Sequence, residues 1–175
     1  ADALKKVTTQ LQNDFSANQL PDALATIFSP RPKTTILNTY ADIVDSAKGL
    51  VCGTFPFSFE KRLKDVLTKD TDHLKYILID EKTKNTTLVT NDRDTLIAYG
   101  GYFKDSLFDW MKETSAGKLF KTGTDFVHNK FLLIDPLSSM PITITGSANF
   151  SANSISSNDE NTLIIHDPFI VSQFY

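Results

Sequence analysis

Residues 126–135 read FVHNKFLLID and place an imidazole and an ammonium group two residues apart. The segment has the composition of a strand, which we predict at residues 127–135. Alternate residues of a strand project from the same face, so the side chains of His128 and Lys130 are expected to lie together. Burying both groups in a core strand without partners is costly. The predicted strand therefore has one apolar face and one chemically reactive face.

Further polar groups stand at the ends of two later predicted strands. The sequence GSAN at residues 146–149 follows a β-rich run at 141–145, and Glu160 comes just before a strand predicted at 162–166. Active sites of open α/β sheets commonly collect at strand ends. We therefore expect Ser147, Asn149 and Glu160 to join His128 and Lys130 in one site.

The chemistry of these groups suits a phosphodiester. The Lys130 ammonium, the Ser147 hydroxyl and the Asn149 amide can hold anionic oxygens as charge develops in the transition state. The His128 imidazole can attack phosphorus or pass a proton to the leaving oxygen. A carboxylate on its second nitrogen would fix the tautomer, and Glu160 is the candidate. No separate cluster with metal-ligand spacing is visible in the sequence, so we expect neither a metal nor another cofactor.

The same residues resemble the HKD signature of the phospholipase D superfamily. The signature is matched by His128-x-Lys130-x4-Asp135, then by Gly146-Ser147-x-Asn149, and the Asn158-Asp159-Glu160 segment is similar to the Asn-Glu segment that follows it in the family. The resemblance extends over roughly residues 33–167. Three separated pieces in the correct order make it specific.

The resemblance implies metal-independent hydrolysis or transfer of a phosphodiester through a covalent phosphohistidine. It implies that His128 is the nucleophile or the general acid, and that Lys130, Ser147 and Asn149 bind the phosphate. Glu160 would orient His128. Asp135 and Gly146 would be structural, and strand parity agrees for Asp135, which lies an odd number of residues from Lys130.

Family members bring two HKD motifs to one active site, whereas this chain has one. The chain either pairs with itself across a two-fold axis or is one half of a longer two-motif protein, and we favour the second explanation. The stretch after Gly146 resembles the second-motif half of tandem bacterial members, in which case His128 would be the general acid. A non-catalytic half-domain that needs its mate is a third hypothesis.

Alternating helix and strand patterns predict an α/β fold, with a mixed central β-sheet flanked by helices on both faces. We divide the chain into an N-terminal helical arm at 1–32, which includes a short helical segment at 22–27, and a catalytic domain at 33–175. The remaining helices are predicted at 39–48, 59–67 (with Ser58 as the N-cap), 102–113 and from 168 onward. The remaining strands are predicted at 50–57, at 74–80 (buried on both faces) and at 86–89.

Composition limits the substrate and the compartment. The 175 residues carry a net charge of -3, which does not support broad, charge-driven nucleic-acid binding. Cys52 is the single cysteine, so no disulfide within the chain is possible, and a reducing, cytoplasmic location is mildly favoured. No membrane-length apolar run and no leader are visible. We favour a phospholipid-type substrate, with an apolar rim from Phe55, Phe57, Trp110 and Phe120, over the alternative of a homodimeric nuclease.

Overall fold

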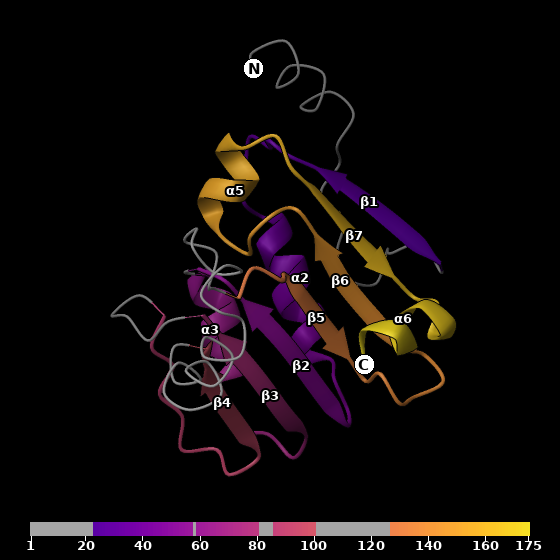
Figure 1. Cartoon of the computed structure of the whole chain (residues 1–175). Helices are drawn as coiled ribbons and strands as arrows, with labels where there is room; N and C mark the ends of the chain where they lie inside the picture. The colour runs from indigo at the N-terminus through magenta and orange to yellow at the C-terminus, as the bar shows by residue number, and fades with distance from the viewer. Residues whose placement is uncertain (1–22, 58, 81–85, 101–126) are drawn as a thin grey trace, which may run out of the picture.

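The computed structural model describes residues 23–57, 59–80, 86–100 and 127–175, and its core is a seven-stranded mixed sheet. The strand order is β1-β7-β6-β5-β2-β3-β4 (Figure 1). The strands are β1 (Leu24–Phe28), β2 (Leu50–Phe55), β3 (Leu74–Ile79), β4 (Thr95–Tyr99), β5 (Phe131–Ile134), β6 (Ile142–Gly146) and β7 (Asn161–Ile165). The described helices are α2 (Ile36–Asp45), α3 (Lys61–Leu67), α5 (Ala152–Ser157) and α6 (Pro168–Phe174).

The direction of the strands decides which loops meet. Strands β2, β3 and β4 are parallel to one another. The other neighbouring pairs, β2–β5, β5–β6, β6–β7 and β7–β1, are all antiparallel. The start of β5, the end of β6 and the start of β7 therefore lie at one edge of the sheet, together with the end of β2. Apart from Asp135, which follows the other end of β5, the predicted site residues of these three strands are adjacent to this edge.

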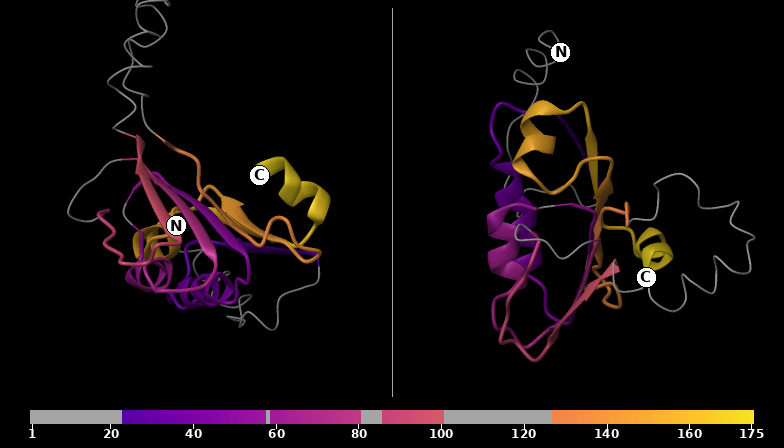
Figure 2. Two further views of the ribbon diagram at one scale, coloured as in Figure 1. Left: turned by 90° about the horizontal axis from the view of Figure 1, so that it is seen from below. Right: turned by 60° about the vertical axis from the view of Figure 1, so that its left-hand side comes forward.

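Helices cover both faces of the sheet, as the sequence predicts. Helices α2 and α3 pack on one face and α6 lies on the other (Figure 2). Alternate strand residues such as Val51, Leu132, Ile144 and Ile164 point toward α2 and α3 and are fully buried. Burial of each such side chain contributes about 1.5–3 kcal/mol relative to exposure. Among the described helices, none has the length and hydropathy that crossing a membrane would require.

The prediction of a helical segment at residues 22–27 is wrong. Leu24–Phe28 is a strand that pairs antiparallel with β7, with Leu24 opposite Ile165 and Phe28 opposite Asn161. Ala25 and Ile27 are buried while their neighbours are exposed, which is the two-residue alternation of an edge strand. A run this short fits a helix or a strand by composition, and pairing with β7 decides between them. Residues 1–22 of the expected arm lie outside the described residues.

Two expectations for the parallel half of the sheet are also wrong. Strand β3 is not buried on both faces, since Leu74 and Tyr76 are each 45% exposed. The strand expected at 86–89 is irregular, and the strand of this region is β4, at Thr95–Tyr99. A buried ion pair fixes its start, because Asp92 Oδ2 accepts hydrogen bonds from Lys75 Nζ at 2.9 Å and from Thr95 Oγ1 at 2.8 Å.

The helices differ from expectation mainly at their ends. Helix α2 begins at Ile36 rather than at residue 39, and the N-cap of α3 is Glu60, whose carboxylate accepts from Arg62 N at 2.7 Å. The expected N-cap Ser58 and the helix expected at 102–113 lie outside the described residues. Helix α5, with the polar sequence ANSISS, was not predicted because it carries no apolar period.

The Asp135 carboxylate ties the end of β5 to the start of β2. It accepts backbone hydrogen bonds from Gly49 N at 2.7 Å, Lys48 N at 2.9 Å and Leu50 N at 3.0 Å. Asp135 has a φ of 48°, a left-handed conformation that Asp and Asn tolerate better than most residues. Burial raises the pKa of the Asp135 carboxyl, but the three backbone hydrogen bonds outweigh it and hold the pKa below its ordinary value.

We predict that Asp135→Asn lowers the free energy of unfolding by about 1–2 kcal/mol at pH 7. Asparagine keeps the left-handed conformation but has one acceptor oxygen for three N–H groups. Because the native pKa of Asp135 is lowered, its contribution is complete above the ordinary carboxyl pKa of about 3.9 and is lost as the pH falls through the lowered value. Urea unfolding at pH 7 and pH 3 measures both effects, and equal stability of the two proteins at pH 7 would contradict the assignment.

Candidate active site

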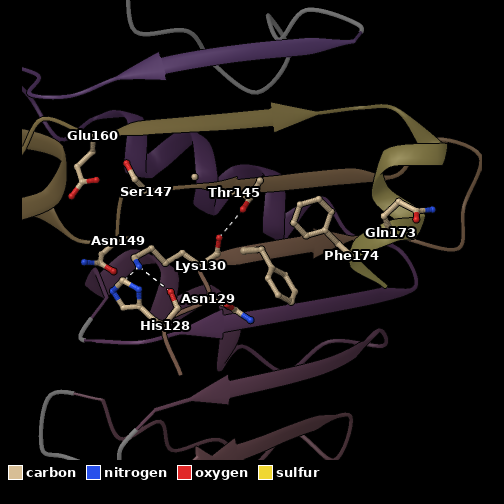
Figure 3. A pocket seen from close by; sticks show the side chains of 11 residues that line it. His128, Asn129, Lys130, Thr145, Ser147, Asn149, Glu160, Gln173 and Phe174 are labelled. Atoms are coloured by element: carbon tan, nitrogen blue, oxygen red, sulfur yellow. Dashed lines mark hydrogen bonds between the residues drawn. The ribbon is translucent and has the colours of Figure 1, made fainter. Parts of the chain in front are cut away.

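One cavity of about 750 Å³ opens at the sheet edge where β5 and β7 begin and β6 ends (Figure 3). It brings together all the predicted site residues except Asp135, which lies at the opposite end of β5. The lining residues are His128, Asn129, Lys130, Phe131, Thr145, Gly146, Ser147, Asn149, Glu160, Gln173 and Phe174.

His128 and Lys130 are in direct contact, as their spacing predicts. Lys130 Nζ lies 3.1 Å from His128 Nε2 and donates to the His128 carbonyl oxygen at 2.9 Å. An ammonium group has no acceptor, so Nε2 accepts and the ring proton of a neutral imidazole is assigned to Nδ1. The Nε2 lone pair is thereby directed toward Lys130. The pair precedes β5 rather than lying within it, because the strand begins at Phe131 and not at residue 127.

Two threonines hold the backbone beside this pair. Thr54 Oγ1 donates to the Asn129 carbonyl at 2.9 Å and accepts from Phe131 N at 3.3 Å. Thr145 Oγ1 donates to the Lys130 carbonyl at 2.9 Å. The segment that carries the imidazole and the ammonium is therefore held between β2 and β6.

Lys130 is buried, with 8% of its surface exposed. Burial lowers the pKa of its ammonium, and the negative charge of Glu160 partly offsets this effect. A cation that has lost most of its water gains more from an anionic ligand than a hydrated one does. Lys130 is therefore suited to bind a phosphate oxygen in the cavity.

Ser147 and Asn149 lie in the turn after β6, which ends at Gly146. Ser147 Oγ accepts from Asn161 N at 3.0 Å, which leaves its own O–H to donate. Asn149 Oδ1 is buried and has no hydrogen-bond partner within the described part of the chain, and Figure 3 shows this side chain beside Lys130. Both side chains can offer a donor to an anion, Asn149 by turning its NH₂ into the cavity.

Gly146 allows this turn to form. Its φ of 152° is one that L side chains rarely adopt, and a Cβ at this position would collide with the Asn161 carbonyl oxygen and would lie 2.9 Å from Thr162 Cα. The absence of a side chain lets β6 approach β7 closely enough for Ser147 to bond Asn161.

Glu160 lines the cavity at the start of β7. Its carboxylate accepts from Asn158 Nδ2 at 3.3 Å, and its carbonyl accepts from Ser29 N at 2.9 Å. Figure 3 shows Glu160 on the opposite side of the cavity from His128, with Lys130 and Asn149 between them. Its electrostatic effect falls on Lys130. The role of Glu160 as the carboxylate partner of His128 stays a prediction.

The apolar rim expected around the site is only partly where it was placed. Phe55 is a core residue, 1% exposed and stacked on Phe59 with ring centroids 4.2 Å apart, so its assignment to the rim is wrong. Phe57 is 48% exposed and meets the His128 ring edge-on at 6.0 Å. Trp110 and Phe120 lie outside the described residues.

Sequence reasoning missed the aromatic part of the cavity. The rings of Phe131 and Phe174 meet edge-on, with centroids 5.8 Å apart and planes at 64°. Phe131 follows Lys130 directly in the sequence, so its place beside the site was predictable. Phe174 lies in the cavity because α6 packs against β6. No local sequence pattern predicts this packing.

The described part of the chain contains no group of three or more His, Cys, Asp or Glu side chains arranged to hold a metal ion. The polar side chains that line the cavity are instead one imidazole, one ammonium, two hydroxyls, three amides and one carboxylate. These groups fit an oxyanion better than a cation.

Known structures share this architecture at low sequence identity. Nuc from Salmonella typhimurium, titled a phospholipase D family member, aligns at a TM-score of 0.53 and 18% identity, over 87% of this chain and 88% of its own. NucT from Helicobacter pylori aligns at 0.59 and 18% identity, over 86% and 89%. Polyphosphate kinase from Porphyromonas gingivalis aligns at 0.60 and 14% identity, over 96% of this chain and 28% of its own. These likenesses confirm the predicted fold.

A family model identifies the sequence more directly. The model described as "Cardiolipin synthase, PLD-like domain" matches residues 86–175, a little over half of the chain. The matched part contains every residue that lines the cavity. The comparison with curated protein sequences gave no match. On the family model and the shared fold together, the chain belongs to the phospholipase D-like family.

Proposed function

We propose that this chain is a metal-independent phosphodiesterase that hydrolyses or transfers a phosphodiester through His128. The observation that carries the proposal is the contact between His128 Nε2 and Lys130 Nζ inside a cavity that Ser147, Asn149 and Glu160 also line. Membership of the phospholipase D-like family supports the reaction class.

In the proposed mechanism, the phosphate is held first. Lys130, the Ser147 hydroxyl and the Asn149 amide donate to its non-bridging oxygens, and Lys130 leaves His128 Nε2 as it turns to the phosphate. The freed Nε2 attacks phosphorus while the bond to the leaving oxygen breaks, and that oxygen takes a proton from a general acid. The deprotonated general acid then takes a proton from water or an alcohol, whose oxygen attacks phosphorus while the bond from phosphorus to Nε2 breaks. This step releases the product and restores both the imidazole and the general acid.

The general acid of this scheme is a second histidine. We propose that a second HKD motif supplies it, from a second copy of this chain. In a longer two-motif protein the roles exchange, with His128 as the general acid and the histidine of the other half as the nucleophile. When two copies pair, one His128 attacks and the other donates the proton. Solution mass distinguishes the arrangements: an active two-fold dimer supports pairing of copies, and an inactive monomer supports a half-site.

We propose a phospholipid-type substrate, with nucleic acid as the alternative. The description of the matching family model supports the first. Lys130 is the one lysine or arginine among the described residues that line the cavity, and two phenylalanines line it as well. A polynucleotide needs several cations in a row for its phosphates, and its binding weakens steeply with salt.

The test is hydrolysis of bis(p-nitrophenyl) phosphate by the chain in EDTA. We expect turnover that resists EDTA and varies little between 50 and about 200 mM salt. Turnover that EDTA abolishes and a divalent metal restores would contradict the mechanism. A folded chain that binds phosphate esters without turnover would favour the non-catalytic half-domain.

A further inference from the structure

We infer that Phe131 and Phe174 form a subsite for an alkyl ester substituent of the substrate, next to the phosphate position at Lys130. This inference rests on the proposed function, because it assigns the phosphate to the polar end of the cavity. It adds the residues that select the organic group attached to that phosphate.

The cavity is divided along its length. Glu160, Ser147 and Asn149 lie at one end, and Phe174 and Gln173 lie at the other, with Lys130 between them (Figure 3). A volume of about 750 Å³ is in the range of pockets that hold a whole small molecule, so it extends well beyond one phosphate group. A phosphate held at the polar end therefore directs one of its ester groups along the cavity toward the aromatic end.

The fold fixes the positions of both rings at the aromatic end. Phe131 begins β5 and is opposite Thr145 of β6 in the sheet. Phe174 is the last residue of α6, a helix anchored by the fully buried Val171 and capped by Asp167, whose carboxylate accepts from Ile170 N at 2.9 Å. The rings meet edge-on, and Phe174 is still 36% exposed, so apolar surface remains for a ligand to cover.

Charge favours an alkyl group over a nucleotide chain as the occupant. Among the described residues that line the cavity, Lys130 is the one lysine or arginine, and it is assigned to the phosphate, so no second cation is available for a neighbouring phosphate at the aromatic end. A neighbouring phosphate of a nucleic acid would therefore meet apolar surface there, whereas an alkyl chain would be desolvated against it.

Calorimetric binding of three phosphate monoesters tests the inference without requiring turnover. The probes are methyl phosphate, octyl phosphate below its micelle concentration, and thymidine 5′-phosphate. We expect octyl phosphate to bind about 10- to 100-fold more tightly than methyl phosphate. Phe174→Ala, a change at the surface, should remove most of this preference, because it weakens the binding of octyl phosphate far more than that of methyl phosphate. Phe169→Ala, on the same helix but outside the cavity and 75% exposed, is the matched control.

An octyl preference that is absent, or that survives both Phe174→Ala and Phe131→Ala, would overturn the inference. Tighter binding than methyl phosphate by thymidine 5′-phosphate alone would also overturn it, because this result would assign the aromatic end to a nucleotide base. Lys130→Gln separates the two proposals, because it should weaken all three probes equally. If Lys130→Gln had no effect while the octyl preference depended on Phe174, the proposed phosphate site would fail and the apolar subsite would stand.

Discussion

His128→Ala should abolish turnover of a phosphodiester, with kcat falling about 10⁴-fold or more. The loss is this large because the imidazole makes and breaks bonds, and removing one member of a covalent machinery costs nearly as much as removing all of it. In a pair of identical chains, the substitution removes the nucleophile and the proton donor together. The measurement is the initial rate on bis(p-nitrophenyl) phosphate in EDTA.

The matched control is His166→Gln, which changes a histidine at the far end of β7 from Glu160, outside the cavity. It should retain the rate of the unchanged chain. Because His128 is an exposed residue, its truncation should leave the thermal unfolding temperature nearly unchanged. A rate for His128→Ala within about tenfold of the unchanged chain would exclude the imidazole from the bond-making steps.

Lys130→Gln should lower kcat/KM about 10³-fold. Deleting one transition-state donor typically costs 10²–10³-fold, and the Lys130 ammonium is both charged and buried, which places it at the upper end of that range. Glutamine keeps a hydrogen-bond donor and much of the length of the lysine side chain, so the loss in kcat/KM measures the contribution of the positive charge. KM should rise and kcat should fall, since the ammonium binds the phosphate in the ground state and more strongly in the transition state.

The control for this change is Lys61→Gln on α3. Lys61 pairs with Asp65 at 2.6 Å on the surface, and its side chain is 81% exposed, so the variant should retain full activity. Comparable losses for the two lysine variants would show that general electrostatics, rather than contact with the phosphate, accounts for the effect of Lys130.

The strands that carry the site were predictable because their apolar content is strong and local. The runs that became β2, β5, β6 and β7 are each rich in aliphatic and β-branched residues, and each buries at least one aliphatic side chain. The contact between His128 and Lys130 was predictable from their spacing of two residues, although the strand begins only after both of them, at Phe131.

The parts that were not predictable depend on contacts between distant segments. Leu24–Phe28 is a strand because β7 offers it an edge, more than 130 residues away in the sequence. Phe174 enters the cavity because α6 folds back over β6. Phe55 and Phe57 are two residues apart, yet one is in the core and the other at the site, because β2 ends at Phe55. The position of Glu160 across the cavity from His128 likewise follows from the turn between α5 and β7.

The most direct test of the central claim is capture of the covalent intermediate. Of the three histidines in the chain, His128 is the one that lines the cavity, so any phosphohistidine formed by the chain alone should be on this residue. The reaction with bis(p-nitrophenyl) phosphate in EDTA would be quenched in alkali, digested and analysed by mass spectrometry. We expect the peptide that contains His128 to carry the phosphoryl ester. Steady turnover with this peptide unmodified at every quench time, or with the ester on another residue, would contradict the account.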